Sequence, residues 1–238
     1  MLELFVTGAD KNSDKIFVTA GLTATMQSLG YSTAVYKPVE IGVIEKNGFV
    51  QSPDLAFVKF VDPYIKTYFT YMFKDKSNPL LAAAKEGIVI EKNNILADYQ
   101  KLEDLHELLV IEGISGLATP LSKNFLEEDL IKMIDKPLLL VVSAFNADIN
   151  NILLTINHAK EKGITHRGII LTNYPENPQN PDIKLLPRII EEYTDVKILG
   201  ILPKFNKAEL NPSDLISEIL GGVDLEAVVN IRIAKLQL

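Results

Sequence analysis

Cysteine is absent from this sequence of 238 residues, so disulfide bonds and thiolate metal sites are excluded. No apolar run approaches the roughly 20 residues that a bilayer-spanning helix needs. No basic segment precedes the first apolar run, so we expect neither a signal peptide nor a membrane span, and we expect a cytoplasmic protein. Positive charge is not in excess either: 24 Lys and Arg against 31 Asp and Glu give a net charge of −7. This balance argues against nucleic-acid binding, which favours a basic surface.

The length and the pattern of the chain predict a single α/β domain spanning residues 1–238. Apolar runs alternate with helical periodicities, as in βαβ units of a doubly wound, mainly parallel sheet with helices on both faces. Residues 138–142 (LLLVV) are apolar on both faces, as strands of a covered parallel sheet are. The predicted strands are residues 2–7, 33–37, 107–112, 137–143, 167–172 and 196–202. The predicted helices are residues 15–29, 93–105, 123–135, 148–162, 182–193 and 224–236.

Polar residues follow most of the predicted strands directly. Ligands of such sheets bind at the carboxyl ends of the strands. Because parallel strands end at one edge, these residues should lie close together and form one anion or nucleotide site. They are Lys37 and Glu40, then Glu112 and Gly113, then Asn173, then Pro203 and Lys204.

Residues 4–19 (LFVTGADKNSDKIFVT) have the layout of a phosphate-binding loop between a strand and a helix. In the pattern G-x-x-x-x-G-K-[ST], backbone N–H groups and the Lys hold phosphates, and the hydroxyl holds Mg²⁺. Counting back from Lys15, the second Gly and the hydroxyl residue would stand at positions 14 and 16, where the chain has Asp14 and Ile16. The strand, the loop and the helix therefore predict a P-loop NTPase-like fold with two working positions changed.

Seven segments, taken together and in order, resemble the motifs of dethiobiotin synthetase over nearly the whole chain. The family's TGTDTxVGKT-like loop is matched by residues 7–16 (TGADKNSDKI), its YKPVxxG element by residues 36–42, and its metal-ligand segment by residues 52–54 (SPD). Its VEGAGGxxxPL element is matched by residues 111–121 (IEGISGLATPL), and its VVxxxxGxINHxLLT element by residues 141–155, with Asn151 in place of the His. Asn173 matches its adenine-side Asn, and residues 199–203 match LGxxP.

The resemblance implies an ATP- and Mg²⁺-dependent cyclo-ligase. In the family, 7,8-diaminononanoate takes up CO₂ (or bicarbonate) as a carbamate, ATP phosphorylates the carbamate, and the second amine closes a cyclic urea. A homodimer is implied, with the active site near its interface. The implied catalytic residues are Lys15 and Lys37, the metal ligands Asp54 and Glu112, and the substrate-binding residues Lys37, Ile41 and Asn150. The implied nucleotide-binding residues are Gly8, Asp10, Asn12, Lys15, Glu112, Gly113, Asn173 and Pro203.

The changed loop positions predict weak nucleotide binding. Ile16 offers no oxygen to Mg²⁺, which needs oxygen ligands. Asp14 removes a Gly where backbone approaches phosphate closely, and it adds a carboxylate. Two like unit charges about 4 Å apart repel by roughly 4 kcal/mol at an effective dielectric near 20. We therefore expect weak ATP binding that Mg²⁺ strengthens little. On the substrate side, Ile41 replaces the family's usual small hydroxyl residue.

Other interpretations of the same residues stay open. The chain is alternatively a non-catalytic paralogue that acts as a binding or regulatory module, or a related P-loop ligase or amidase of the cobyrinate-amidase type with another substrate. Asp54, after Ser-Pro, also suits a helix N-cap. His106, His158 and His166 are expected at the surface without partners.

Overall fold

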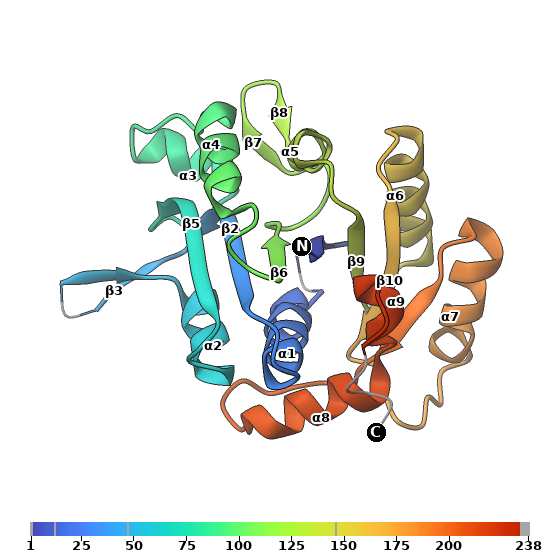
Figure 1. The fold of residues 1–238 in the computed structure, drawn as a ribbon. Coiled ribbons are helices and arrows are strands. Elements are labelled where there is room, and N and C mark those ends of the chain that lie inside the picture. The colour runs from blue at the N-terminus through green and yellow to red at the C-terminus, as the bar shows by residue number, and fades with distance from the viewer. Residues whose placement is uncertain (1, 12, 47, 146, 234–238) are drawn as a thin grey trace.

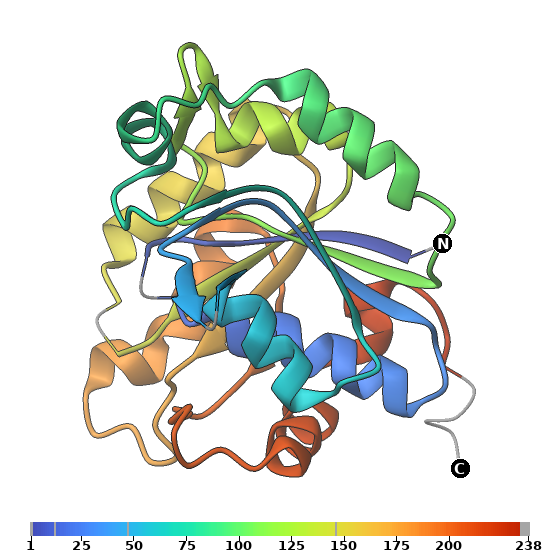
Figure 2. The ribbon, with the colours of Figure 1, turned by 90° about the vertical axis from the view of Figure 1, so that its left-hand side faces the viewer.

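The computed structural model describes residues 2–11, 13–46, 48–145 and 147–233 of the chain. Its centre is a sheet of seven strands in which all neighbouring strands run parallel. In spatial order these strands are β11 (Ile198–Ile201), β10 (His166–Thr172), β9 (Leu138–Ser143), β1 (Leu2–Gly8), β6 (Leu108–Glu112), β2 (Thr33–Ile41) and β5 (Lys66–Phe73). The sheet, with helices on both sides, confirms the predicted doubly wound α/β fold (Figures 1 and 2).

Helices cover both faces because successive strand residues point to opposite sides. On one face, Phe5 of β1 packs in a cluster with residues of α3, α4 and α5. On the other, Leu4 and Val6 pack with residues of α1, α8 and α9. Helices α6 and α7 share a further cluster with β9 and β10. The helices are α1 (Lys15–Ser28), α2 (Pro53–Val61), α3 (Pro79–Lys85), α4 (Lys92–Leu102), α5 (Glu127–Ile134), α6 (Ile149–Glu161), α7 (Pro181–Thr194), α8 (Pro212–Gly222) and α9 (Leu225–Val229).

Helix α1 follows β1 after a short loop and lies beneath the sheet, packed on α2 and α8 (Figure 2). Residues 16–26 of this helix are all buried. A Cβ on Gly21 would stand 2.6 Å from Ile219 of α8, so glycine allows the two helices to approach. This packing fixes the start of α1, and with it the loop after β1, beside the carboxyl ends of β2 and β6.

The structure differs from the sequence-based expectation at several elements. The prediction contained no strand at 66–73, yet β5 forms an edge of the sheet and pairs with β2. The predicted helix at 123–135 begins only at Glu127, because residues 120–126 form a hairpin of β7 (Pro120–Ser122) and β8 (Phe125–Leu126). The predicted helix at 224–236 ends at Val229, since Asn230 takes a left-handed conformation with φ 56°. Residues 234–236 lie outside the described part.

A second hairpin projects from the body between β2 and α2 (Figure 1). It consists of β3 (Ile44–Lys46) and β4 (Phe49–Gln51), which pair antiparallel. Among the described residues, no helix is both long and apolar enough to cross a membrane.

Candidate functional site

Lys37, near the middle of β2, is surrounded by three carboxylates and is almost fully buried, at 3% exposure. Its Nζ lies 2.8 Å from Glu40 Oε2, 2.7 Å from Asp54 Oδ2 and 3.0 Å from Glu112 Oε1. Glu112 is the last residue of β6, and Asp54 stands in the first turn of α2. The predicted convergence is therefore seen for Lys37, Glu40 and Glu112, although Lys37 and Glu40 lie within β2, which extends to Ile41 and not to residue 37 as predicted.

These ion pairs decide the charge states of the cluster. Burial alone would lower the pKa of Lys37, but Glu112, Glu40 and Asp54 together raise this pKa well above its usual value. For Asp54, burial opposes ionisation, yet Lys37 and Lys207 lower the pKa to about 2. Burial raises the pKa of Glu40, and Lys37 partly offsets this. Lys37 is therefore a charged ammonium, and the neighbouring carboxylates balance its positive charge.

Ser52 links this cluster to helix α2. Its Oγ accepts a hydrogen bond from the backbone N–H of Leu55, 3.0 Å away, and so caps the helix. The same hydroxyl donates to Glu40 Oε2 at 3.0 Å. Ser52, and not Asp54, is thus the N-cap, which leaves the Asp54 carboxylate free to face Lys37.

The loop between β1 and α1 closes tightly on itself. A Cβ on Gly8 would stand 2.2 Å from Ser13 Oγ and 2.5 Å from the carbonyl oxygen of Asp10, so only glycine fits. At the end of the loop, Lys15 donates from Nζ to the carbonyl oxygen of Ile114, directly after β6. The predicted phosphate-binding lysine therefore lies beside the segment that carries Glu112.

The side chain of Asp14 is bound to the residue that follows β10. Asp14 has a left-handed conformation, with φ 54°, and its side chain does not cap α1. Its Oδ2 accepts a hydrogen bond of 2.7 Å from Asn173 Nδ2, which also donates to Ser143 Oγ at 3.0 Å. A second bond, from Thr172 Oγ1 to the Ser13 carbonyl, ties the loop to β10. Asn173, which is predicted to contact the adenine, is thus hydrogen-bonded to Asp14, the residue that replaces the second glycine of the phosphate-binding loop.

Glu127, which the sequence analysis did not single out, is a fully buried carboxylate behind the site. It accepts hydrogen bonds from Thr7 Oγ1 and from the backbone N–H groups of Ile114 (2.9 Å) and Ser115 (3.3 Å). A Cβ on Gly113 would lie 2.2 Å from Glu127 Oε1, so this carboxylate accounts for the glycine. In the sequence, Glu127 has the signal of an ordinary acidic residue in a first helical turn, and nothing there indicates burial.

Two cavities adjoin these residues. A polar cavity of about 260 Å³ is lined by Lys15, Lys37, Glu40, Ile41 and Asp54 among others. The predicted substrate residue Ile41 thus faces the same space as Lys37.

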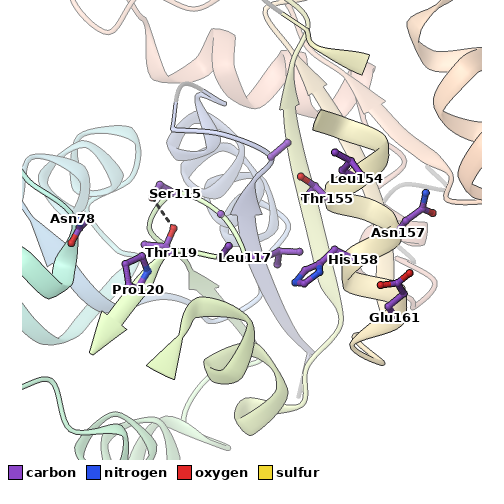
Figure 3. A pocket seen from close by; sticks show the side chains of 13 residues that line it. Asn78, Ser115, Leu117, Thr119, Pro120, Leu154, Thr155, Asn157, His158 and Glu161 are labelled. Atoms are coloured by element: carbon purple, nitrogen blue, oxygen red, sulfur yellow. Dashed lines mark hydrogen bonds between the residues drawn. The ribbon is translucent and has the colours of Figure 1, made fainter. Parts of the chain in front are cut away.

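A larger cavity of about 710 Å³ lies between the loop after β6 and helix α6 (Figure 3). Ser115 and Thr119, whose hydroxyls are 3.0 Å apart, line one side, and Leu154 and His158 of α6 line the other (Figure 3). Asn78 and Ser115 line both cavities, so the two spaces are neighbours.

Some predicted residues are not brought to this site. Asn150 is exposed in the first turn of α6, and neither cavity's lining includes it. Asp10 is exposed in the loop. Asn12 lies outside the described residues. Pro203 directly follows Leu202, whose carbonyl accepts from the N–H of Tyr174, so it stands near Asn173.

The expectation that the histidines have no partners is wrong for two of them. His158 Nε2 contacts Glu128, which also pairs with Lys162 at 2.8 Å. His106 lies 3.0 Å from the Tyr68 hydroxyl. These partners come from elements distant in sequence, which local patterns do not reveal.

The site fits a nucleotide-bound Mg²⁺ ion. The buried Glu112 pairs through Oε1 with Lys37 Nζ at 3.0 Å, whereas its Oε2 has no hydrogen-bond partner among the described residues. A buried carboxylate oxygen without a partner suits a hard cation. No group of three His, Cys, Asp or Glu in the described part could hold a metal alone. Mg²⁺, however, is commonly bound by one or two carboxylates together with substrate phosphates and water, and Asp54 and Glu112 provide two.

The start of α1 likewise suits phosphate. This 14-residue helix has no acidic residue in its first turn. Backbone N–H groups at a helix N-terminus attract anions, and the Lys15 ammonium stands beside them.

The chain is similar to known proteins over most of its length. Residues 3–211 match a family model described as an AAA domain. The chain is 32% identical over 205 residues to the ATP-dependent dethiobiotin synthetase BioD of Anoxybacillus flavithermus, covering 85% of this chain and 92% of that protein. It is 30% identical over 233 residues to the enzyme of the same name from Bacillus licheniformis, covering 97% of each chain.

Among solved structures, the cell division ATPase MinD of Pyrococcus furiosus is similar with a TM-score of 0.58 and 15% identity, covering 92% of this chain and 98% of that one. That likeness concerns the fold alone. The sequence relationship extends over the segments that carry Gly8, Lys15, Lys37, Asp54 and Glu112, and the chain belongs to the ATP-dependent dethiobiotin synthetase family.

Proposed function

We propose that this protein is an ATP- and Mg²⁺-dependent cyclo-ligase that forms a cyclic urea from 7,8-diaminononanoate and CO₂. The observation that carries the proposal is the Lys37 cluster at the edge of the sheet. A fully charged ammonium lines a small polar cavity that it shares with Lys15. The arrangement places the Lys15 and Lys37 ammonium groups beside the carboxylates of Asp54 and Glu112, and that combination suits transfer of a phosphoryl group.

The reaction has three steps. One amine adds to CO₂ and loses a proton, which gives a carbamate anion. A carbamate oxygen attacks the γ-phosphorus of ATP, and ADP leaves. The second amine then attacks the carbamoyl carbon, the bond between this carbon and the phosphate oxygen breaks, and phosphate leaves. Loss of a proton from the attacking nitrogen gives the cyclic urea.

The chain's own residues would orient and neutralise these anions. Lys37 would contact the carbamate and the γ-phosphate, where negative charge gathers during transfer. Lys15 would leave the carbonyl of Ile114 for the β- and γ-phosphates. Asp54 and Glu112 would hold Mg²⁺, which supplies further charge neutralisation on the phosphates when bound. Ile41, on the wall of the same cavity, would contact the diamine.

The proposal is tested by phosphate release from ATP with 7,8-diaminononanoate and bicarbonate, together with mass spectrometry of the product. We expect phosphate and cyclic urea in equal amounts, each dependent on the diamine. Lys37→Met should lower kcat by about a hundredfold or more, as the loss of a group that stabilises transferred charge does. Lys101→Met is the matched control, because Lys101 is exposed on α4 and its ion pair is with Asp98 of the same helix.

Absence of diamine-dependent product under saturating ATP would contradict the ligase proposal. Binding of ATP without turnover would then favour the binding or regulatory module. Turnover with another acid or amine would favour a related ligase or amidase.

A further inference from the structure

Glu40 has no role in the proposed reaction, yet it is one of the three carboxylates that hold Lys37. Its Oε2 lies 2.8 Å from Lys37 Nζ, and only 4% of the residue is exposed. The same oxygen accepts the Ser52 hydroxyl at 3.0 Å. Glu40 is thus a buried carboxyl group on the wall of the polar cavity, held by Lys37 on one side and by Ser52 on the other.

The three carboxylates around Lys37 differ in whether they are also expected to bind Mg²⁺. Asp54 and Glu112 are the two that we assign to Mg²⁺. If both carboxylates held the ion, they would offer less of their charge to the Lys37 ammonium. A buried charge that loses its partners is strongly destabilised. Glu40 is the one carboxylate of the cluster that the metal does not require.

The position of Glu40 is set by its own strand and by Ser52. Its strand β2 pairs with β5, where Glu40 stands opposite Met72. Ser52, its hydrogen-bond donor, is fixed as the N-cap of α2. A carboxylate held in this way can keep one place while Asp54 and Glu112 turn to an ion.

We propose that Glu40 is a positioning residue, which keeps the Lys37 ammonium in place when a metal–nucleotide complex draws Asp54 and Glu112 away. This inference rests on the proposed function, because the metal site and the role of Lys37 belong to it. It explains why a carboxylate lies beside the lysine in addition to the two expected metal ligands.

The direct test follows the ammonium protons of Lys37 by ¹H–¹⁵N NMR, with the signal assigned by its absence in Lys37→Met. The probe is Mg²⁺ with β,γ-methylene-ATP, which is not hydrolysed. In the parent protein we expect slow proton exchange with and without the probe. In Glu40→Gln we expect slow exchange in the free protein, and exchange about tenfold or more faster once the probe binds. Equal exchange in both bound proteins would overturn the inference.

A ligand-free pair of variants separates this inference from the proposed function. Asp54→Asn removes one metal-site carboxylate with no ion present, so Lys37 depends more on Glu40. We expect a slow Lys37 signal in Asp54→Asn, and its loss in the double variant with Glu40→Gln. If calorimetry shows no binding of Mg²⁺ and β,γ-methylene-ATP to the parent, the proposed function fails, and this pair still decides the role of Glu40. A retained signal in the double variant refutes that role.

Kinetics provide a readout that a purely structural role would not change. In Glu40→Gln, kcat should fall about tenfold or more while KM for ATP changes by less than about threefold, because Lys37 acts on the transferred group. Glu40→Asp should restore part of kcat. Glu45→Gln, on the exposed β3–β4 hairpin, is the matched control. A lower melting temperature with unchanged kcat and Lys37 exchange would mean that Glu40 is only structural.

Discussion

Asp14 and Ile16 show how two single residues change a phosphate-binding loop. The sequence predicted repulsion between Asp14 and phosphate, but the structure gives that carboxylate a partner in Asn173. Ile16 is 7% exposed and packs in an apolar cluster with Leu55 and Phe57. The first change therefore affects the predicted adenine side as well as the phosphates, and the second has become part of the core.

Asp14→Gly combined with Ile16→Thr should raise ATP affinity at least tenfold, about 1.4 kcal/mol. Glycine suits the left-handed conformation at position 14 and frees Asn173, and threonine returns a metal-binding hydroxyl. Titration calorimetry with Mg²⁺ measures the gain. Adding Lys15→Ala should abolish this gain in affinity. An unchanged dissociation constant in the double variant would show that the loop binds nucleotide in another way.

Ile16→Thr should also lower the free energy of unfolding by about 2 kcal/mol, because it removes buried apolar atoms.

Glu127 should make stability depend on pH. Burial raises its pKa, although hydrogen bonds from Thr7, Ile114 and Ser115 partly offset this. A carboxyl with a raised pKa binds more protons in the folded than in the unfolded chain, so stability falls as pH rises above about 4.5. This contribution is absent from Glu127→Gln. We therefore expect the stability deficit of this variant, measured by urea unfolding, to be smaller at pH 7 than at pH 5.

The control for this measurement is Glu192→Gln, at an exposed position on α7. It should leave the pH dependence of the parent unchanged. A deficit in Glu127→Gln that is equal at both pH values would contradict a buried, ionising carboxylate.

At the scale of elements, helix α2 connects stability to the site. One serine hydroxyl caps the helix and also holds Glu40. Loss of an N-cap costs about 1 kcal/mol. The same loss here also removes a hydrogen bond from a buried carboxylate, so the cost should exceed that of an ordinary cap.

Ser52→Ala should lower the free energy of unfolding by about 2 kcal/mol, from the cap and the Glu40 contact together. Asn211→Ala removes the N-cap of α8, far along the chain from Glu40, and should cost only about 1 kcal/mol. Urea unfolding of both variants gives the comparison. Equal costs would show that the bond to Glu40 adds nothing.

At the scale of the whole molecule, the homodimer stays a prediction. The larger cavity opens on α6, where Leu154 is 59% exposed (Figure 3). A large apolar residue so exposed at the mouth of a cavity suits an interface. We expect a dimer by sedimentation, and a shift to monomer without loss of folding in Leu154→Glu. Leu185→Glu, on α7 and 46% exposed, is the matched control and should stay dimeric. A monomeric parent protein at micromolar concentration would contradict the prediction.

The sequence by itself determined six of the seven strands of the sheet, the loop and the main charged residues. Continuous apolar runs such as residues 138–142 are typical of covered parallel strands, and Gly8 and Lys15 mark the loop that follows one. Parallel strands end at a common edge, so Lys37 and Glu112 could be expected to meet. Edge strand β5 was missed because its half-exposed aromatic residues do not form a continuous apolar run.

The tertiary structure alone decided which groups pair within the site. Glu40 and Glu127 have the local sequence of ordinary acidic residues. Their burial follows from contacts with Ser52 and with the loop after β6, which lie 12 to 13 residues away. The bond between Asp14 and Asn173 spans 159 residues. Local patterns record propensity and periodicity, whereas the cost of burying a charge is set by partners that only the folded chain brings together.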